Sequence, residues 1–321
     1  MSAAPEQFRE LLSKRRYSPD TLLPPENKIF TIAGQTIGCT NSLVTFSGLP
    51  KSGKSTFLAG LVASRILHTD CLGMELASPK ERSRIAYFDT ESSPHDFYRQ
   101  VERIRKFAFN DPIPEYIDMF CTREDSPGWQ KALIEQYIKD TPEAAVVIVD
   151  GLLDLIIDYN DPTESRNLIQ WIKTLTARHD ILFITVLHTS KSGEQRLGHI
   201  GAGVDRYSQS VLEIVKENGN YILKPKYLRS SAGFEDIAIS YDSDSGMYNI
   251  IGEMEPAPDI SQEMLNLMEY NRRYTYRELI DIIKQAKNRG DNYAKSIIRE
   301  MKDKKHIEKD NTGKYFRLVS F

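Results

Sequence analysis

Short apolar segments alternate with helical stretches through most of the chain. The segments that predict strands are SLVTFS, RIAYFDTE, YIDMFC, AAVVIVDGL and ILFITVLH. Each is rich in β-branched residues and apolar on both alternations, as in strands of a parallel sheet covered on both faces. Their spacing of roughly 30 residues suits repeated βαβ units. The pattern therefore predicts an α/β fold in which a mostly parallel sheet carries helices on both faces.

Hairpins flank this alternating region. The segment KIFTIAGQTIG predicts one hairpin, with its turn at 33–35, and SVLEIVKENGNYILKPKYLR predicts another, with its turn at 218–219. The segment IAISYD predicts one more short strand. We expect residues 1–28 to form an N-terminal arm with a short helix, and residues 29–251 to form the main domain.

A different pattern follows this domain. Residues 252–260 carry two prolines and few apolar groups, which predicts a linker. Residues 261–321 then combine three helical stripes with two short strands, and a capping box from Thr275 to Glu278 opens the second helix. Three helices and a hairpin are the elements of a winged helix-turn-helix, so we expect a small winged-helix domain here.

Composition narrows the class of protein. The chain has 321 residues, is 40% hydrophobic and 27% charged, and has no apolar run near the roughly 18 residues that span a bilayer. We expect neither a secretory signal nor a membrane partner. The three cysteines are scattered and lack CxxC spacing, which favours a cytoplasmic location over a disulfide framework or a zinc site.

Charge is unevenly distributed along the chain. The net charge is −3, yet residues 261–321 hold 14 Lys and Arg against 9 Asp and Glu. This region is therefore at +5 and the remainder at −8. A basic C-terminal region on an acidic body suggests a partner for the basic part.

The segment GLPKSGKST matches the phosphate-loop pattern GxxxxGK[ST] and directly follows a predicted strand. Its glycines let successive amides turn inward around phosphate oxygens, and the following helix adds its positive N-terminal end. Lys54 would reach the β- and γ-phosphates of ATP. Lys51 lies outside the pattern, and a solvated side chain is the alternative for it. The candidate nucleotide-binding residues are Gly48, Pro50, Lys51, Ser52, Gly53, Lys54, Ser55 and Thr56.

A phosphate loop also needs ligands for the Mg²⁺ that accompanies the nucleotide. The hydroxyl of Ser55 is one, and a carboxylate at the end of a neighbouring strand is usually the other. Asp150 directly follows the apolar run AAVVIV. We therefore predict that Ser55 and Asp150 hold Mg²⁺, the alternative being that Asp150 only caps a loop.

Hydrolysis needs a group that orients or deprotonates the attacking water. Glu91 ends the run RIAYFDTE, where it would face the γ-phosphate across the strand ends. Asp89 could substitute, because strand alternation puts both carboxylates on one side. A helix N-cap is the structural alternative for Glu91. His188, at the end of ILFITVLH, is placed to sense the γ-phosphate, or else forms an ordinary loop hydrogen bond.

These residues, in this order, resemble the RecA-type ATPase core, and specifically the RepA-like and DnaB-like helicase branch found on bacterial plasmids and mobile elements. The stretches that carry the resemblance lie in residues 29–250. They are IFTIAGQTIG, SLVTFSGLPKSGKST, AYFDTESS, VVIVDGLLDLIIDYND, VLHTSK and GHIGAGVDRYSQSVLEI. His188 departs from the Gln that is usual in the DnaB branch, which puts its γ-phosphate sensing in question.

The resemblance implies an ATP-hydrolysing, RecA-like core that assembles into homo-oligomeric rings, usually hexamers, with nucleotide between subunits. Glu91 would then be the catalytic carboxylate. A neighbouring subunit would supply cationic fingers, for which Lys226 and Arg229 in KPKYLRSS are the candidates. An arginine that reaches the developing charge can contribute about 10³–10⁵ in rate. A merely solvated strand is the alternative.

The resemblance also implies a central channel for single-stranded DNA, lined by the loops after the Asp150 and His188 strands. The second loop, TSKSGEQRLGHIGAG, holds Lys191, Arg196 and His199 among glycines, which suits contact with backbone phosphates. The first loop, DYNDPTES, is acidic, which counts against a DNA contact.

Duplex DNA is the expected partner of the C-terminal module. Lys295, Arg299 and Lys302 fall at i, i+4 and i+7 of its third helix, opposite the apolar stripe. This is the pattern of a recognition helix. Docking of a protein on the same face is the alternative.

Together these features predict a cytoplasmic ATPase that couples ATP hydrolysis to work on DNA in replication, mobilisation or recombination of a plasmid or mobile element. One alternative is a DNA-binding regulator or recombination accessory in which ATP only switches the assembly state. The other is a small-molecule kinase, which would need an acceptor pocket and show no stimulation by DNA.

Overall fold

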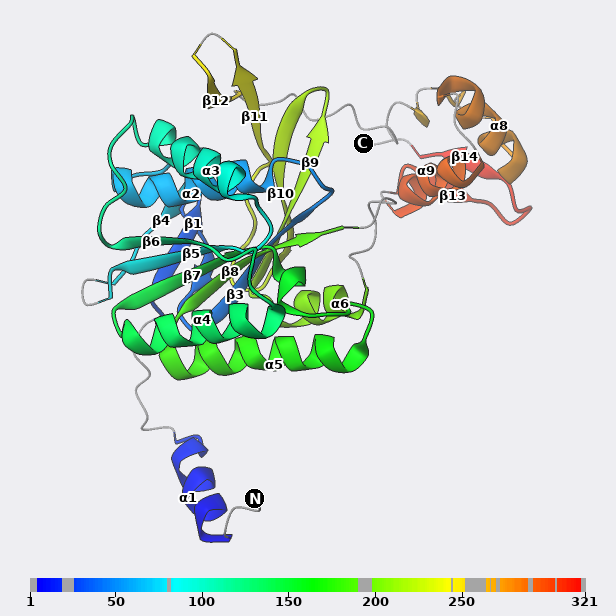
Figure 1. The fold of residues 1–321 in the computed structure, drawn as a ribbon. Helices are drawn as coiled ribbons and strands as arrows, with labels where there is room; N and C mark the ends of the chain where they lie inside the picture. The colour runs from blue at the N-terminus through cyan, green and yellow to red at the C-terminus, as the bar shows by residue number, and fades with distance from the viewer. Residues whose placement is uncertain are drawn as a thin grey trace. The chain divides into compact units, whose positions relative to one another are not determined.

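The computed structural model describes residues 5–18, 26–79, 82–189, 198–243, 245–251, 264–265, 267–269, 272–287, 291–303 and 305–318. The chain divides into two compact units, Met1–Ile250 and Ile251–Phe321, and each is described by itself (Figure 1). The predicted linker at 252–260 lies outside the described residues.

A nine-stranded sheet forms the centre of the first unit within its described residues, in the order β12-β11-β10-β9-β3-β8-β7-β5-β6. The strands from β9 to β6 run parallel, and β10, β11 and β12 extend the sheet as antiparallel neighbours. Their bounds are β3 Ser42–Gly48, β5 Arg84–Asp89, β6 Ile117–Cys121, β7 Ala144–Asp150, β8 Leu182–His188, β9 Ser210–Glu217, β10 Asn220–Leu228, β11 Ile237–Asp242 and β12 Met247–Ile250. The predicted α/β fold with a mostly parallel sheet is confirmed, and it is consistent with a RecA-like core.

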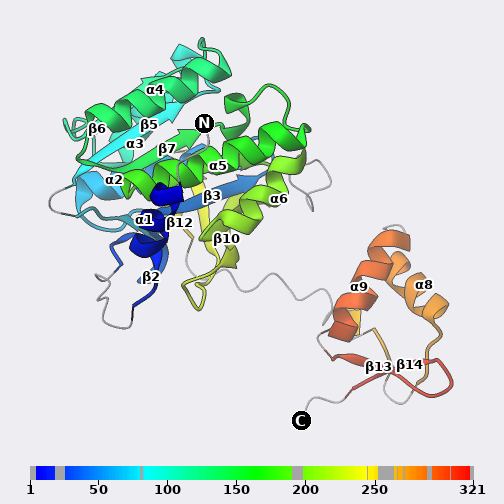
Figure 2. The ribbon, with the colours of Figure 1, turned by 90° about the horizontal axis from the view of Figure 1, so that it is seen from below.

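Helices cover both faces of this sheet (Figure 1). One face carries α2 (Lys54–Leu67) and α3 (Pro94–Phe107), and the other carries α4 (Pro127–Asp140), α5 (Pro162–His179) and α6 (Gly198–Tyr207), with α5 and α6 side by side in Figure 2. β7 shows why: Val146 and Ile148 pack toward α2, whereas Val147 and Val149 pack toward α5, and all four are buried. A strand buried on both faces must be apolar on both alternations.

A small antiparallel sheet, β2-β1-β4, packs into the same core as α2. Its strands are β1 (Lys28–Ile32), β2 (Gln35–Cys39) and β4 (Met74–Leu76). The predicted hairpin is present, but its turn is the left-handed pair Ala33–Gly34, and Gln35 already belongs to β2.

The predicted hairpin between β9 and β10 is also present. Its turn residues Asn218 and Gly219 are both left-handed, with φ of 50° and 85°. Two further elements of the first unit are α1 (Pro5–Arg15), in the predicted arm, and a 3₁₀ turn, η1 (Leu152–Leu155), directly after β7.

In the second unit, α8 (Tyr276–Lys287), α9 (Asp291–Asp303) and the hairpin β13 (Ile307–Lys309)–β14 (Tyr315–Arg317) enclose a core of their own. Thr275 and Glu278 form the predicted capping box, because the amide of each donates to the side chain of the other. Backbone hydrogen bonds between Tyr274 and Tyr315, of 2.8 and 2.7 Å, tie the start of α8 to the hairpin. The winged-helix assignment itself stays a prediction.

No helix in the described part of the chain combines the length and the apolar character that a membrane crossing requires.

Candidate functional site

The phosphate loop connects the end of β3 at Gly48 to the start of α2 at Lys54. Gly53 stands at the helix N-cap in a left-handed conformation, with φ of 96°, and offers no side-chain cap. The first amides of α2 are therefore left without side-chain acceptors and carry the positive end of the helix dipole. A Cβ on Gly53 would lie 2.6 Å from the ring of Tyr221, and one on Gly48 would lie 2.3 Å from the carbonyl oxygen of Ile214. Both positions require glycine.

The ammonium group of Lys54 is held inside this loop. It donates to the carbonyl oxygens of Gly48, at 3.1 Å, and Leu49, at 2.7 Å, and its side chain is buried. Burial lowers the pKa of Lys54 to about 8, although the charges of Asp150 and Glu91 act to raise it. Near it, the hydroxyl of Ser52 is buried without a hydrogen-bond partner among the described residues. A bound phosphate would supply the negative charge and the acceptor that these groups lack.

A hydroxyl and a carboxylate meet at the start of α2. Ser55 Oγ donates to Asp150 Oδ2 at 3.0 Å, and Tyr87 Oη, from β5, donates to the same oxygen at 2.7 Å. Gln100 of α3 anchors this group, because its amide donates to the backbone oxygen of Ser55 and to Tyr87 Oη. The sequence analysis predicts the roles of Ser55 and Asp150 but assigns none to Tyr87 or Gln100. Each of these two is a polar side chain at a position that is otherwise apolar, and this is the sequence signal that could have indicated their roles.

Asp150 is buried, and burial raises the pKa of its carboxyl to about 6. Hydrogen bonds from Tyr87 and Ser55 act in the opposite direction, whereas the charges of Asp89 and Glu91 add to the rise. These oxygens fit a Mg²⁺ ion, because the ion prefers oxygen ligands and would offset the crowded negative charge. Within the described residues no group of three or more His, Cys, Asp or Glu could hold a metal, so most ligands here would be phosphate and water oxygens.

The two candidate catalytic carboxylates, Glu91 and Asp89, separate at the end of β5. β5 ends at Asp89 rather than continuing to Glu91, because Asp89 Oδ1 accepts from the amides of Glu91, at 3.1 Å, and Ser92, at 2.8 Å. Asp89 is buried in this turn, whereas Glu91 lines the cavity. The expectation that both carboxylates lie on one side is therefore wrong. Ser93, not Glu91, caps α3, since its hydroxyl accepts from the amide of Asp96.

His188, at the end of β8, contacts Glu91 directly. Its Nε2 donates to Glu91 Oε2 at 3.2 Å, and this hydrogen bond lowers the pKa of Glu91 more than any other contact does. The other ring nitrogen, Nδ1, is buried without a hydrogen-bond partner among the described residues. The sequence alone does not predict this contact between Glu91 and His188, because no local pattern links two residues that lie 97 positions apart.

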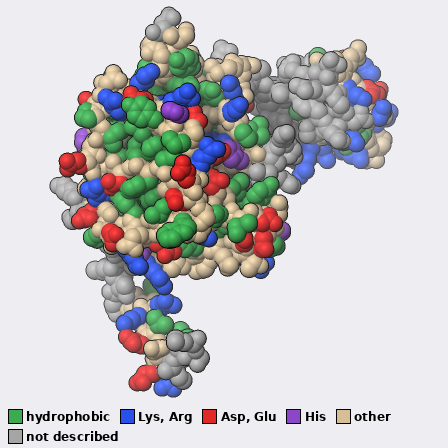
Figure 3. Space-filling view, viewed as in Figure 1, with side chains coloured by type: hydrophobic (Ala, Val, Ile, Leu, Met, Phe, Trp, Pro, Cys, Tyr) green, Lys and Arg blue, Asp and Glu red, His purple; other side chains and the backbone are tan. Residues whose placement is uncertain are grey.

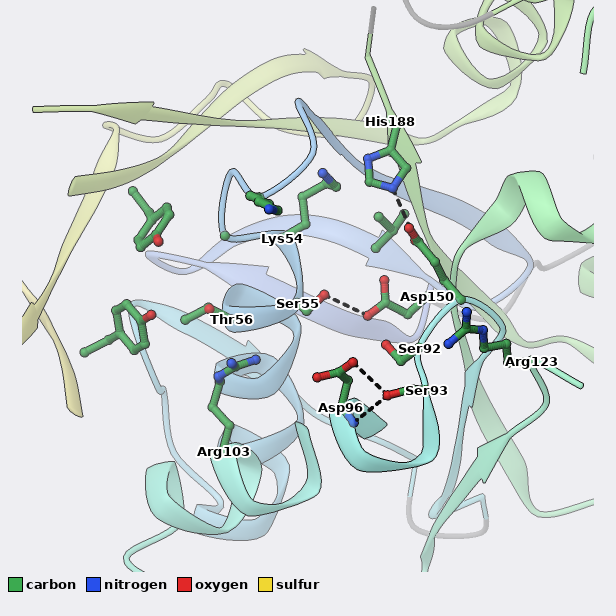
Figure 4. Close-up of a pocket in the computed structure, with 16 residues that line it drawn as sticks. Lys54, Ser55, Thr56, Ser92, Ser93, Asp96, Arg103, Arg123, Asp150 and His188 are labelled. Atoms are coloured by element: carbon green, nitrogen blue, oxygen red, sulfur yellow. Dashed lines mark hydrogen bonds and ion pairs between the residues drawn. The ribbon is translucent and has the colours of Figure 1, made fainter. Parts of the chain in front are cut away.

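These groups surround one cavity of about 490 Å³ at the carboxyl ends of the parallel strands. Figure 4 shows Lys54 and His188 above the Ser55–Asp150 pair, with Arg123 and Ser92 on one side and Thr56 and Arg103 toward the other. In Figure 3, basic, acidic and histidine side chains lie close together near the middle of this unit. Arg123, which had no role in the sequence analysis, enters the cavity from the loop after β6.

Tyrosines from the antiparallel strands close the cavity next to Thr56. Tyr221 of β10 lies over Gly53, and its ring centroid is 5.8 Å from that of Tyr248 in β12. Arg103 borders both this cavity and a neighbouring one of about 520 Å³, and Tyr248 does too. The aromatic side chains suit the nucleoside part of a ligand whose phosphates lie in the loop.

The predicted cationic fingers lie elsewhere. β10 runs antiparallel to β9, so Arg229, just after its last residue, lies at the amino-terminal end of β3 and β9, opposite the phosphate loop. Arg229 is exposed and donates to the backbone oxygen of Arg206, whereas Lys226 is partly buried and forms an ion pair with Glu213. Arg229 therefore cannot reach the phosphate loop of its own chain.

Of the three residues of the first unit that are predicted to contact single-stranded DNA, the structure describes one, His199. Lys191 and Arg196 lie outside the described residues. His199 is exposed, but it lies on α6 rather than in a flexible loop, because the helix runs from Gly198 to Tyr207 despite its glycines. In the acidic segment, Asp161 caps α5 and Glu164 accepts from the amides of residues 157 and 158, so these carboxylates serve local structure.

The predicted basic face of the second unit is present. Lys295, Arg299 and Lys302 are exposed on α9, while its apolar side is buried in the core of the unit. The three cations and Tyr276 border a cavity of about 420 Å³.

Residues 38–194 match the family model described as an AAA domain. The match supports a P-loop ATPase. The matched part of the chain contains the phosphate loop, Glu91, Asp150 and His188. No curated protein matches the chain.

The buried Asp150 gives a prediction about stability. Its pKa is higher in the folded chain than in the unfolded chain, so without ligand its ionised form costs stability above pH 6. We expect Asp150→Asn to raise the free energy of unfolding of the ligand-free chain at pH 8 by about 1–3 kcal/mol. The gain should shrink as the pH falls from 6 toward 4, where wild-type Asp150 is itself protonated.

Urea denaturation at pH 8 and pH 4.5 measures this difference. Asp140→Asn, at an exposed position on α4, is the matched control and should change stability by less than about 0.5 kcal/mol at either pH. A less stable Asp150→Asn chain at pH 8 would show that the buried carboxylate is already compensated.

Proposed function

We propose that the chain is an ATP-hydrolysing, DNA-associated motor of the RepA-like and DnaB-like type, which acts as a homo-oligomer on a plasmid or mobile element. The observation that carries the proposal is the single cavity shared by Lys54, the Ser55–Asp150 pair and the Glu91–His188 pair. These residues would supply a phosphate anchor, metal ligands and a carboxylate for water within one site.

The residues of the cavity divide the work of hydrolysis. Lys54 and the loop amides would bind the β- and γ-phosphates, and Ser55 and Asp150 would hold Mg²⁺, which neutralises phosphate charge when bound. Glu91, whose ionised form is favoured because the hydrogen bond from His188 lowers its pKa, would accept a proton from water as the water oxygen attacks the γ-phosphorus. The bond to the bridging oxygen then breaks, and ADP and phosphate leave.

In this scheme His188 would be a positioning residue that orients the carboxylate of Glu91. Its hydrogen bond fixes the direction of the Glu91 carboxylate, which is otherwise half exposed. A carboxylate held in one direction loses less rotational freedom when it binds the attacking water.

The position of Arg229 supports assembly. An exposed arginine at the opposite end of the sheet from the phosphate loop can complete a site only in another copy of the chain. A head-to-tail contact of this kind closes into a ring when its rotation allows. Lys226, which is paired with Glu213, is the weaker candidate for the same task.

DNA is the proposed partner because of the basic face of α9. Lys295, Arg299 and Lys302 project from one side of an exposed helix in a unit with net positive charge. Such a face suits duplex DNA in the manner of a winged helix. His199, with Lys191 and Arg196, remains the proposed contact for single-stranded DNA.

We expect Glu91→Gln to bind ATP within about threefold of the wild-type affinity while its kcat falls by 10² or more, because the amide cannot accept the proton. Asp89→Asn should keep most of the activity, since an amide oxygen can still accept from the turn amides. Titration calorimetry with Mg²⁺ and ATP, together with phosphate release, measures both quantities.

Lys54→Ala is the reference in that series and should bind ATP poorly. If Asp89→Asn stops turnover while Glu91→Gln retains it, the assignment of the carboxylate is reversed.

If a neighbouring subunit supplies Arg229 to the site, two inactive variants should restore activity when they are mixed. Arg229→Ala and Lys54→Ala should each be inactive alone, but their equal mixture should recover up to about a quarter of the wild-type rate, because some interfaces pair an intact site with an intact finger. Phosphate release before and after mixing measures the recovery. A mixture no faster than its components would argue against a finger supplied by a neighbour.

The experiment that tests the motor measures ATP hydrolysis with no DNA, with a single-stranded oligonucleotide and with a duplex. We expect stimulation by DNA, and we expect Lys295→Ala/Lys302→Ala to weaken duplex binding and to reduce its salt dependence by about two counterions. Arg277→Ala, on α8 and paired with Asp281, is the control and should bind as wild type.

Slow turnover that neither DNA changes would contradict the motor and favour a regulator switched by ATP. Unchanged duplex binding by the double variant would indicate that the face of α9 docks a protein.

A further inference from the structure

Arg123 is a cation of the nucleotide cavity for which the proposed function gives no task. It lies in the turn after β6, two residues beyond the end of that strand at Cys121. β6 is the edge neighbour of β5, so this turn lies beside the segment that carries Glu91. The inference below rests on the proposed ATPase site and deepens it.

The backbone that carries Arg123 is fixed to the site. The amide of Thr122 donates to the carbonyl oxygen of Asp89 at 2.8 Å, and its hydroxyl donates to the same oxygen at 3.3 Å. From α4, the side-chain amide of Gln130 donates to the carbonyl oxygen of Thr122 at 2.9 Å. Thr122 and Gln130 are both buried. The start of the Arg123 side chain is therefore held next to the end of β5.

The guanidinium group of Arg123 has no hydrogen bond or ion pair among the described residues, although Glu124 and Asp125 follow it directly. The other cations near the reacting centre are engaged: Lys54 with two carbonyl oxygens, and Arg103 with Gln100 at 2.5 Å. Figure 4 shows Arg123 beside Ser92 and facing Asp150 across the cavity. Its charge also acts on Glu91, whose pKa it helps to lower.

Lys51 is a cation of the cavity too, but it belongs to the phosphate loop. A γ-phosphate gripped by Lys54 and approached by water from Glu91 would have Arg123 on the Glu91 side. That is the side on which the attacking water and the loosened phosphoryl group lie in an in-line displacement. An arginine fork can bind two oxygens of such a group at once, and it stays protonated throughout.

We propose that Arg123 is a catalytic residue that binds the γ-phosphoryl oxygens of the ATP held by its own chain. As the water oxygen bonds to the γ-phosphorus, the bond to the bridging oxygen breaks and its electrons stay on ADP. Glu91 takes the proton of the water, and Arg123 stabilises the charge on the phosphoryl oxygens without transferring a proton. Each subunit thus supplies a cation to its own nucleotide, whatever a neighbour adds through Arg229.

The test uses the full chain with Arg123→Ala and Arg123→Lys, and with Arg105→Ala as the matched control, since Arg105 lies on α3 and pairs with Glu102. We expect Arg123→Ala to lower kcat by about 10²–10³ while the affinity for ADP changes by less than about threefold. It should also lose the tight binding of ADP with Mg²⁺ and aluminium fluoride, which mimics the transferred group. Arg123→Lys should recover part of kcat, and Arg105→Ala should behave as wild type.

A wild-type kcat with intact binding of the aluminium fluoride complex in Arg123→Ala would overturn the proposal. So would an equal loss of ADP and aluminium fluoride binding, since that indicates a structural role. Lys54→Ala and Glu91→Gln, assayed alongside, report separately on the proposed ATPase. If both turn over as wild type, the ATPase site itself is wrong.

Mixing distinguishes the source of the cation. Arg123→Ala mixed with Lys54→Ala should recover no activity, because the chain that binds ATP lacks its own arginine. The mixture of Arg229→Ala with Lys54→Ala serves as the positive control for exchange of subunits. Recovery in the Arg123 mixture would show that Arg123 acts on a neighbour's nucleotide and would overturn the assignment to the same chain.

Discussion

Two opposite charges are buried at one edge of the sheet, and the rest of the site depends on how each is compensated. Lys54 has a pKa lowered to about 8 and Asp150 a pKa raised to about 6, both because of burial. Neither is neutralised by a direct partner, since Lys54 donates to carbonyl oxygens and Asp150 accepts from hydroxyl groups. A nucleotide and a metal ion would compensate both charges at once. The two buried charges destabilise the ligand-free fold, and binding would remove this cost, which would favour binding.

The parallel sheet is what brings these charges together. β3, β5, β7 and β8 all end at the same edge, so Gly48, Asp89, Asp150 and His188 meet although they lie far apart along the chain. The antiparallel extension does the reverse, because β10 returns to the opposite edge and leaves Arg229 there. One sheet therefore presents the candidate nucleotide site at one end and an exposed arginine at the other, which is the asymmetry that the proposed head-to-tail ring needs.

The sequence predicted the parts of this site that depend on local pattern. The apolar runs located the parallel strands, and the glycine spacing located the phosphate loop, because both signals are contiguous. It could not predict that Asp89 would turn its carboxylate to the amides of Glu91 and Ser92, or that His188 would meet Glu91, since these depend on how strand ends align. β4 and β12 are too short to leave a periodic signal, and α6 forms in spite of its glycines because Ile200 and Val204 are buried against α5.

Arg123 and Asp150 both line the cavity from the carboxyl ends of strands, but only Asp150 could be predicted from the sequence. Asp150 could be predicted because it ends an apolar strand, whereas Arg123 stands in a polar turn whose neighbours are Glu124 and Asp125, a context typical of solvent. Only the fold shows that Thr122 ties this turn to Asp89, so that the arginine enters the cavity. In the proposed scheme Arg123 of the same chain and Arg229 of a neighbour would contact one phosphoryl group. Hydrolysis would then need both the fold of one chain and its assembly with another.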